Sequence, residues 1–130
     1  MERAEQTLVQ SILDSAERIH QTLGPGFIED IYCRAFLCEL GEQGLRVERE
    51  KLIRIRYGST IVGKHRLDLV VAGQFIVELK AVSSIIPVHL AQMRSYLQAA
   101  GYPLGLIINF GALLLQWELV PWIDKREADR

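Results

Sequence analysis

Residues 66 to 82 read RLDLVVAGQFIVELKAV, two apolar strands around a short turn, and this stretch sets the expected fold. Successive side chains of a strand point to opposite faces, so Glu78 and Lys80 are expected on one face. Directly opposed residues of an antiparallel hairpin also share a face. A three-residue loop at 72–74, in which Gly73 or a neighbour takes a left-handed conformation, would set Asp68 opposite Glu78. A two-residue loop would place the two acids on opposite faces.

The paired acids predict a site for a divalent cation. Two carboxylates about 4 Å apart repel by roughly 4 kcal/mol at an effective dielectric constant of about 20, and a bound cation removes that cost. Carboxylate oxygens suit Mg²⁺, with water or a substrate phosphate in the remaining octahedral positions. Lys80 could position a water molecule or stabilise charge that develops on phosphate. The simpler interpretation is an ion pair between one acid and Lys80 on a solvated strand face, which this loose pattern alone does not exclude.

Apolar periodicity and turn residues outline the other elements. Residues 45–58 combine an apolar and a cationic strand face, and Pro87 fits the first turn of a helix that stops at Gly101. The order α-α-β-β-β-α-β, with an optional last strand, predicts an α/β sandwich around a mixed sheet. The expected helices are 3–22, 27–43 and 87–100; the expected strands are 45–58, 66–71, 75–82 and 104–110 (buried on both faces), with a short strand at 60–64, a further strand at 113–120 and a frayed tail at 124–130.

Composition narrows the classes of protein. A chain of 130 residues suits one domain with a substantial core, and 49% hydrophobic with 24% charged residues is ordinary globular usage. The first residues, MERAEQTLVQ, lack the apolar region of a signal peptide, and no apolar run approaches the ~18 residues of a membrane span. Cys33 and Cys38 predict two reduced, partly buried thiols, and hence a cytoplasmic protein without a zinc site.

Charge is balanced overall but not locally. The net charge is −1, yet residues 46–66 hold seven Lys and Arg against two acids, Glu48 and Glu50. Such a stripe is either a solvated strand face or a surface that contacts phosphate. The candidates for contact with a nucleic-acid backbone are Arg54, Arg56, Lys64 and Arg66.

Glu29 and a ridge on the third helix add polar groups. Helical spacing places Glu29 on a largely apolar stripe, where an unpaired buried charge is costly, so we expect a metal ion or a cation beside it. Alternatively, it is an acid favoured near a helix N-terminus by the helix dipole. His89, Gln92 and Tyr96 share one helix face at i, i+3 and i+7, as a functional ridge or as a wet helix surface.

Four ordered motifs together resemble a known family. GFIEDIY at 26–32 matches the G-x-x-E-x-x-Y signature of the small GxxExxY proteins, which are assigned to the PD-(D/E)xK nuclease superfamily. RLDLVV, FIVELKAV and PVHLAQMRSYLQAAGYPLGLIINFG are similar to the rest of that pattern, and Gln92 with Tyr96 resembles the Q-x-x-x-Y motif of exonuclease-like branches. The resemblance covers about residues 5–111. Leu67 stands where the family often has proline, and the chain after Phe110 departs from the pattern.

The resemblance implies a fold and a set of roles. We expect a single nuclease-like domain over 1–130, with a restriction-endonuclease-like core at about 5–111, a mixed sheet of four to five strands flanked by helices, and a C-terminal extension at 112–130. Lys80 would be the catalytic lysine, and Gln92 and Tyr96 would orient the site or touch nucleic acid. The implied ligands of Mg²⁺ or Mn²⁺ are Asp68, Glu78, the Leu79 main-chain carbonyl and the helical acid Glu29.

Three functions follow as hypotheses. The first is a metal-dependent nuclease that hydrolyses DNA or RNA with a metal-bound water, with DNA as the first choice of partner. The second is a non-catalytic nucleic-acid-binding or assembly module on the same scaffold, whose apolar residues near Trp117, Trp122 and 113–115 could form a homodimer seam. The third is an unrelated metal-dependent hydrolase of small molecules. The sequence contains no Gly-rich phosphate loop, Ser/His/Asp order or zinc-ligand spacing that would support it.

Overall fold

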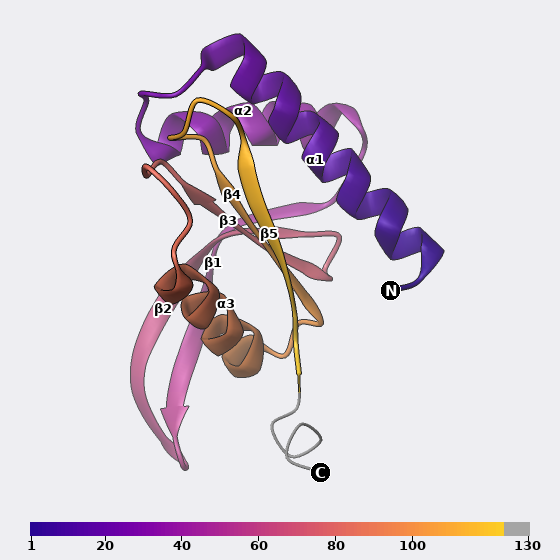
Figure 1. The fold of residues 1–130 in the computed structure, drawn as a ribbon. Helices are drawn as coiled ribbons and strands as arrows, with labels where there is room; N and C mark the ends of the chain where they lie inside the picture. The colour runs from indigo at the N-terminus through magenta and orange to yellow at the C-terminus, as the bar shows by residue number, and fades with distance from the viewer. Residues whose placement is uncertain (124–130) are drawn as a thin grey trace.

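The structure, a computed structural model, describes residues 1–123. Its elements occur in the order α-α-β-β-β-α-β-β, so the predicted order holds and the optional last strand forms (Figure 1). The elements are α1 (Arg3–Leu23), α2 (Glu29–Glu42), β1 (Val47–Tyr57), β2 (Thr60–Val71), β3 (Phe75–Lys80), α3 (Pro87–Ala100), β4 (Leu104–Asn109) and β5 (Gln116–Pro121).

The five strands form one mixed sheet in the order β1-β2-β3-β4-β5. Neighbouring strands are antiparallel except β3 and β4, which α3 connects in parallel. Val71 pairs with Phe75 at the end of the β2–β3 hairpin, which leaves the predicted three-residue loop. Ala72 and Gly73 both take left-handed backbone conformations there, with φ of 56° and 63°. The loop length on which the pairing of the two acids depended is therefore confirmed.

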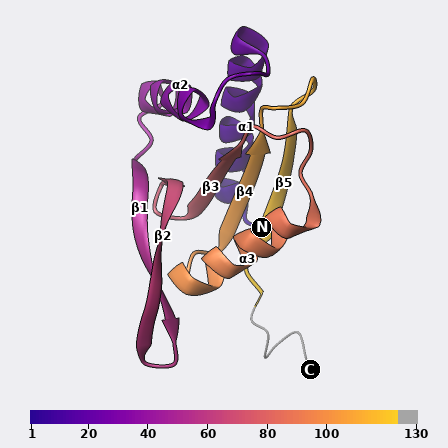
Figure 2. The same cartoon turned by 90° about the vertical axis from the view of Figure 1, so that its left-hand side faces the viewer.

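Helices cover both faces of the sheet, as Figures 1 and 2 show from two sides. α1 and α2 pack on one face, where Phe36 and Ile12 meet Val77 of β3. α3 packs on the other face, where Met93 and Leu97 meet Ile76 of the same strand. All six residues of β4 are buried, as predicted for a strand covered on both faces.

Turn chemistry at α3 follows the sequence. Pro87 begins the helix, and Gly101 ends it in the left-handed conformation with φ of 78°. One predicted element was wrong: the segment at 60–64 is not a separate short strand but the first part of the 12-residue strand β2. The frayed tail expected at 124–130 lies outside the described residues.

β1 and β2 extend beyond the body of the sheet as a long two-stranded arm, which points away from α1 and α2 in Figures 1 and 2. Register pairs along the arm run from Arg49↔Leu69 to Tyr57↔Thr60, with an irregularity between Ile55 and Arg56. Gly58 and Ser59 form the turn at its tip. Among the described helices, none combines the length and apolar composition that a membrane crossing requires.

Candidate active site

Asp68 and Glu78 lie beside each other where β2 and β3 separate. The backbone ladder between these strands ends at Leu69↔Val77, and two side chains continue the hydrogen bonding beyond it. The Asp68 carboxylate accepts a hydrogen bond from the Leu79 backbone N–H at 2.8 Å. The Glu78 carboxylate accepts one from the Asp68 backbone N–H at 3.3 Å. Each acid is thus anchored to the backbone of the opposite strand, and the two carboxyl groups converge.

An irregularity in β2 permits this arrangement. Residues two apart in a strand normally share a face. Leu69, however, belongs to the core under α1 and α2, whereas Leu67 belongs to the core under α3. The strand therefore changes faces at Asp68, and Glu50 in the neighbouring strand has a φ of 52°. We attribute the freedom of the Asp68 side chain to turn towards β3 to this local distortion.

The surroundings of Glu78 strongly raise the pKa of its carboxyl group. Its side chain is only 7% exposed. Burial, followed by the nearby Asp68 carboxylate, raises the pKa of Glu78 to about 9, against a partial lowering by Lys80. A buried carboxyl beside a second carboxylate is a group whose ionised form needs a positive partner.

Lys80 and the Leu79 carbonyl complete the end of β3. Lys80 follows Glu78 by two residues, is half-buried, and accepts a hydrogen bond at its backbone oxygen from Phe110 of the chain after β4 at 2.9 Å. The N–H and C=O of one strand residue point to the same neighbour. Because the Leu79 N–H reaches Asp68, the Leu79 carbonyl also points towards the space beside Asp68.

A pocket of about 190 Å³ opens beside Asp68 and Leu79. Glu29, the first residue of α2, also lines it, so the structure brings this predicted residue to the same opening. The premise that Glu29 is buried was wrong. The helix begins at Glu29 rather than at residue 27, so its side chain projects from the first turn and is exposed.

The pocket also contains residues that the sequence did not single out. Arg49 of β1 forms an ion pair with Asp30 of α2, and both line the pocket. Asp30 also pairs with Arg34 at 2.8 Å, and the hydrogen bond from Arg34 is the main cause that lowers the pKa of Asp30. The pair of Arg49 with Asp30 links β1 to α2 across the opening, whereas the pair of Arg34 with Asp30 lies within α2. No spacing rule connects residues of a helix and a strand so far apart in sequence, and only the fold reveals them.

On α3, Tyr96 lies near the acids. Burial raises the pKa of Tyr96, and the charges of Glu78 and Asp68 add to the rise. Its ring stacks on His65 of β2, with ring centroids 4.1 Å apart. Gln92 is half-buried one turn earlier. His89, in contrast, accepts a hydrogen bond from the Ile86 backbone N–H at 3.1 Å, so it completes the start of the helix.

Asn109 is a further polar residue that the sequence left without a role. It is fully buried in the apolar run of β4. Its side-chain oxygen accepts hydrogen bonds from the N–H of Val82 and Gly111, and its amide donates to the Val82 carbonyl and to Gln116. Asn109 thereby ties the chain that follows Lys80 to β4 and β5. A lone amide in a buried strand was the available signal, because buried polar groups require partners.

The four candidate phosphate contacts all lie on the arm and are exposed. Arg54 pairs directly with Lys64, and Arg66 pairs with Leu52. Arg54 and Arg56 also border a groove of about 420 Å³ between β1 and α3. Within residues 1–123, the ion pairs of the structure involve none of these four cations.

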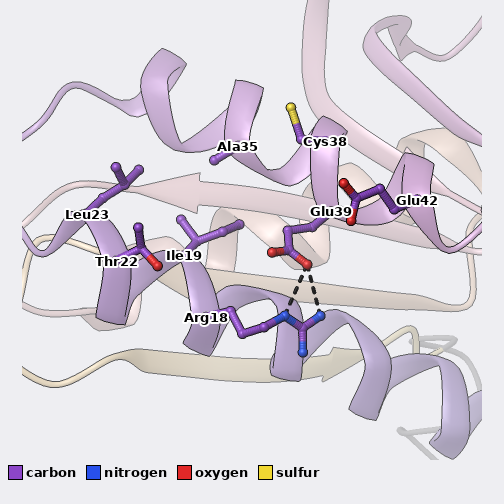
Figure 3. A pocket seen from close by; sticks show the side chains of 8 residues that line it. All are labelled: Arg18, Ile19, Thr22, Leu23, Ala35, Cys38, Glu39 and Glu42. Atoms are coloured by element: carbon purple, nitrogen blue, oxygen red, sulfur yellow. Dashed lines mark hydrogen bonds and ion pairs between the residues drawn. The ribbon is translucent and has the colours of Figure 1, made fainter.

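A second cavity, of about 270 Å³, lies between α1 and α2 (Figure 3). Arg18 and Glu39 form an ion pair across it at 2.9 Å, which raises the pKa of Arg18. Exposed Cys38 is at its wall, and buried Cys33 lies in the pocket beside Asp68; both are free thiols. Asp68 and Glu78 are not among the residues that line this cavity between α1 and α2.

Metal-binding capacity depends on few side chains. Among residues 1–123, no three Asp, Glu, His or Cys side chains lie close enough together to hold one ion. Asp68, Glu78 and the Leu79 carbonyl provide two carboxylates and one main-chain oxygen in adjacent positions. Hard oxygen donors of this kind suit Mg²⁺ or Mn²⁺, which keep several water or phosphate ligands.

Comparisons with known proteins identify a superfamily and a fold. The sequence profile described as the PD-(D/E)XK nuclease superfamily matches residues 6–120. The protein SSO0001 shares the fold with a TM-score of 0.57 at 18% identity, over 76% of this chain and 52% of that one, so this chain spans about half the length of SSO0001. The alkaline exonuclease LHK-Exo from Laribacter hongkongensis gives 0.50 at 13% identity, over 88% and 79% of the two chains. Its complex with dAMP gives 0.51 at 14% identity, over 88% and 80%.

No curated protein sequence matches the chain. At these identities the solved structures establish the fold alone, and they confirm the α/β core with its mixed sheet that was expected to be restriction-endonuclease-like. The match over residues 6–120 extends through β5 and covers most of the sequence. The chain therefore belongs to the PD-(D/E)XK nuclease superfamily.

Proposed function

We propose that the protein is a metal-dependent nuclease that hydrolyses phosphodiester bonds, with DNA as the first choice of substrate. The observation that carries this proposal is the reciprocal anchoring of Asp68 and Glu78, with Lys80 two residues beyond Glu78 on β3. The two carboxyl groups repel each other when both are ionised, and a bound cation removes that repulsion. Membership in a nuclease superfamily and the likeness to an exonuclease solved with dAMP support the same chemistry.

Asp68, Glu78 and the Leu79 carbonyl would hold Mg²⁺ or Mn²⁺. When bound, the ion would neutralise phosphate charge and lower the pKa of a coordinated water. Glu29 lines the pocket beside Asp68 and Leu79 and would reach the ion through water. The perturbed pKa of Glu78 fits this assignment, because a cation is what its ionised form lacks.

Lys80, Gln92 and Tyr96 would act on the substrate. Lys80, beside Glu78, would hold the attacking water or stabilise charge on the phosphate. Tyr96, held by its stacking on His65, and Gln92 would orient the scissile phosphate. Arg49 at the pocket wall is a further cation within the opening.

The arm would hold the nucleic-acid backbone. Like charges directly opposite each other destabilise a strand pair, and Arg54 faces Lys64 across β1 and β2. A polyanion relieves that repulsion, whereas a plain solvated surface leaves it uncompensated. This favours phosphate contact by Arg54, Arg56, Lys64 and Arg66 over the simpler interpretation.

The test is cleavage of labelled DNA and RNA strands with Mg²⁺ or Mn²⁺. The wild-type protein should cleave, and Glu78→Ala and Lys80→Ala should each lose at least about 100-fold in rate. Glu17→Gln, an exposed acid on α1, is the matched control and should cleave at the wild-type rate. Equal rates in all four proteins would identify a contaminating nuclease and reject the proposal.

The second candidate is a non-catalytic nucleic-acid-binding or assembly module. One observation favours it: Leu113 and Leu114 in the β4–β5 connection are almost fully exposed, and Trp117 and Trp122 are about half exposed, on the edge strand β5 and just after it. Calorimetry separates the two functions, because this module would bind DNA without binding Mg²⁺ or Mn²⁺. A homodimer through these residues, membership in the GxxExxY branch and a cytoplasmic location stay predictions.

A further inference from the structure

The tip of the β1–β2 arm combines exposed apolar side chains with concentrated positive charge. Tyr57 is 82% exposed, Val62 60% and Ile61 46%, beside the turn at Gly58 and Ser59. Tyr57 pairs with Thr60 to close the turn, so its ring stands at the far end of the arm. A group of exposed apolar side chains, unlike a single one, is a candidate interaction surface.

Charge identifies the kind of partner. Residues 51–67 contain five Lys and Arg and no Asp or Glu, within a chain whose net charge is −1. The arm is therefore a positive element on an otherwise balanced molecule, and a polyanion complements it. An apolar protein partner would leave the cations of the arm without compensation.

We propose that Tyr57, at the tip of the arm, forms a binding site that stacks on an unpaired base, so that the substrate carries a single-stranded segment. This inference rests on the proposed function and names its substrate class. Base faces are covered inside a duplex, and they become available to an aromatic ring in single strands and at ends. Cations along the backbone together with an aromatic platform are the combination that binds single strands.

The length of the arm sets the distance between this site and the catalytic acids. Strand β2 runs eight residues from Asp68 to Thr60, which pairs with Tyr57. At about 3.3 Å per residue, the tip lies about 26 Å from Asp68. Stacked nucleotides advance about 3.4 Å each, so about eight nucleotides separate the stacked base from the bond to be cleaved. Arg54, Lys64 and Arg66 belong to the same arm but to its other face, because Tyr57 alternates with Arg56 and Arg54 along β1.

The experiment measures binding of labelled single strands by fluorescence anisotropy in a chelator, which prevents cleavage. We expect a twelve-nucleotide oligo-dT strand to bind more tightly than a duplex of the same length, and a four-nucleotide strand to bind much more weakly. Tyr57→Ala should weaken binding of the long strand at least about fivefold. Tyr57→Phe keeps the ring and should bind as wild type, and so should Ser59→Ala, the matched control in the turn.

Unchanged binding by Tyr57→Ala, or duplex binding as tight as single-strand binding, would overturn the inference. Thermal unfolding of each variant checks that the exposed substitution leaves the fold intact. A failure here is distinguishable from a failure of the proposed function, because cleavage by Tyr57→Ala with Mg²⁺ or Mn²⁺ is assayed separately. A variant that cleaves but binds as wild type rejects the tip site and retains the nuclease.

Discussion

Glu78 links the stability of the fold to pH. Its pKa of about 9 in the folded chain lies above the ordinary value of 4.5, because burial and Asp68 disfavour the charged form. Protonated Glu78 therefore contributes stability that is complete below pH 4.5 and is lost as pH rises towards 9. We expect the metal-free protein to lose a few kcal/mol of unfolding free energy over this range. Urea unfolding at pH 5, 7 and 9 in chelator measures it.

Glu78→Gln is the control for that titration. The amide cannot ionise, so its unfolding free energy should depend less on pH, and the two curves should approach each other at low pH. Added Mg²⁺ or Mn²⁺ should raise the melting temperature of the wild type at pH 8 and leave the variant almost unchanged, because a cation compensates the ionised acid. Parallel pH curves for the two proteins would contradict the assignment of the titration to Glu78.

Single residues differ in how far the sequence predicts them. The alternation of strand faces and the length of one loop, both local quantities, predicted that Asp68 lies beside Glu78, but they did not predict that β2 changes faces at Asp68. The burial of Glu29 was wrong because helical spacing does not fix where a helix begins. The place of Arg49 in the pocket could not be predicted, because its ion-pair partner Asp30 lies on an element distant in the sequence. Asn109 carried a signal, a lone amide in a buried strand, but its partners come from two loops that only the fold brings together.

At the scale of elements, the chain that follows β3 lies very close to the backbone of the chain that follows β4, at Val82 and Gly111. A Cβ added at Gly111 would lie 2.3 Å from the Val82 carbonyl oxygen, whereas one at Gly105 would meet only the Met93 side chain. Backbone cannot yield as a flexible methionine can, so Gly111→Ala should destabilise more than Gly105→Ala, by about 1–3 kcal/mol. Urea unfolding compares the two, and a larger loss at Gly105 would contradict this account.

The arm is a second element whose design can be tested, because its like charges face each other. Lys64→Glu places an acid opposite Arg54 and should stabilise the strand pair by about 0.2–1 kcal/mol. The same change should weaken binding of nucleic acid, since it removes a cation from the backbone path. Thermal unfolding and anisotropy should therefore move in opposite directions. If Lys64→Glu lowered both the stability and the binding of nucleic acid, Lys64 would be a residue that stabilises the fold.

Elements were predicted better than their lengths. Proline, glycine and apolar runs marked α3 and β4 because these signals act locally. The arm escaped prediction because Gly63, Lys64 and His65 interrupt the apolar alternation, so 60–64 and 66–71 look like separate strands in sequence. Pairing with β1 over the whole length joins them. That pairing is a non-local interaction, which no window of sequence contains.

At the scale of the whole molecule, charge distribution determines how salt affects binding. A net charge of −1 gives no general attraction to nucleic acid, so attraction depends on the arm. If Arg54, Arg56, Lys64 and Arg66 each neutralise one phosphate, the affinity for a single strand should fall with log salt at a slope of about −3, from four contacts at about 0.7 each. Arg54→Ala should reduce that slope by the share of about one phosphate contact.

The control variant is Arg3→Ala, at the start of α1. It should leave the slope unchanged, because that cation lies outside the arm. Anisotropy titrations between about 50 and 200 mM salt measure all three slopes. An equal reduction by both variants would show that attraction is spread over the molecule, and the arm would lose its assigned role.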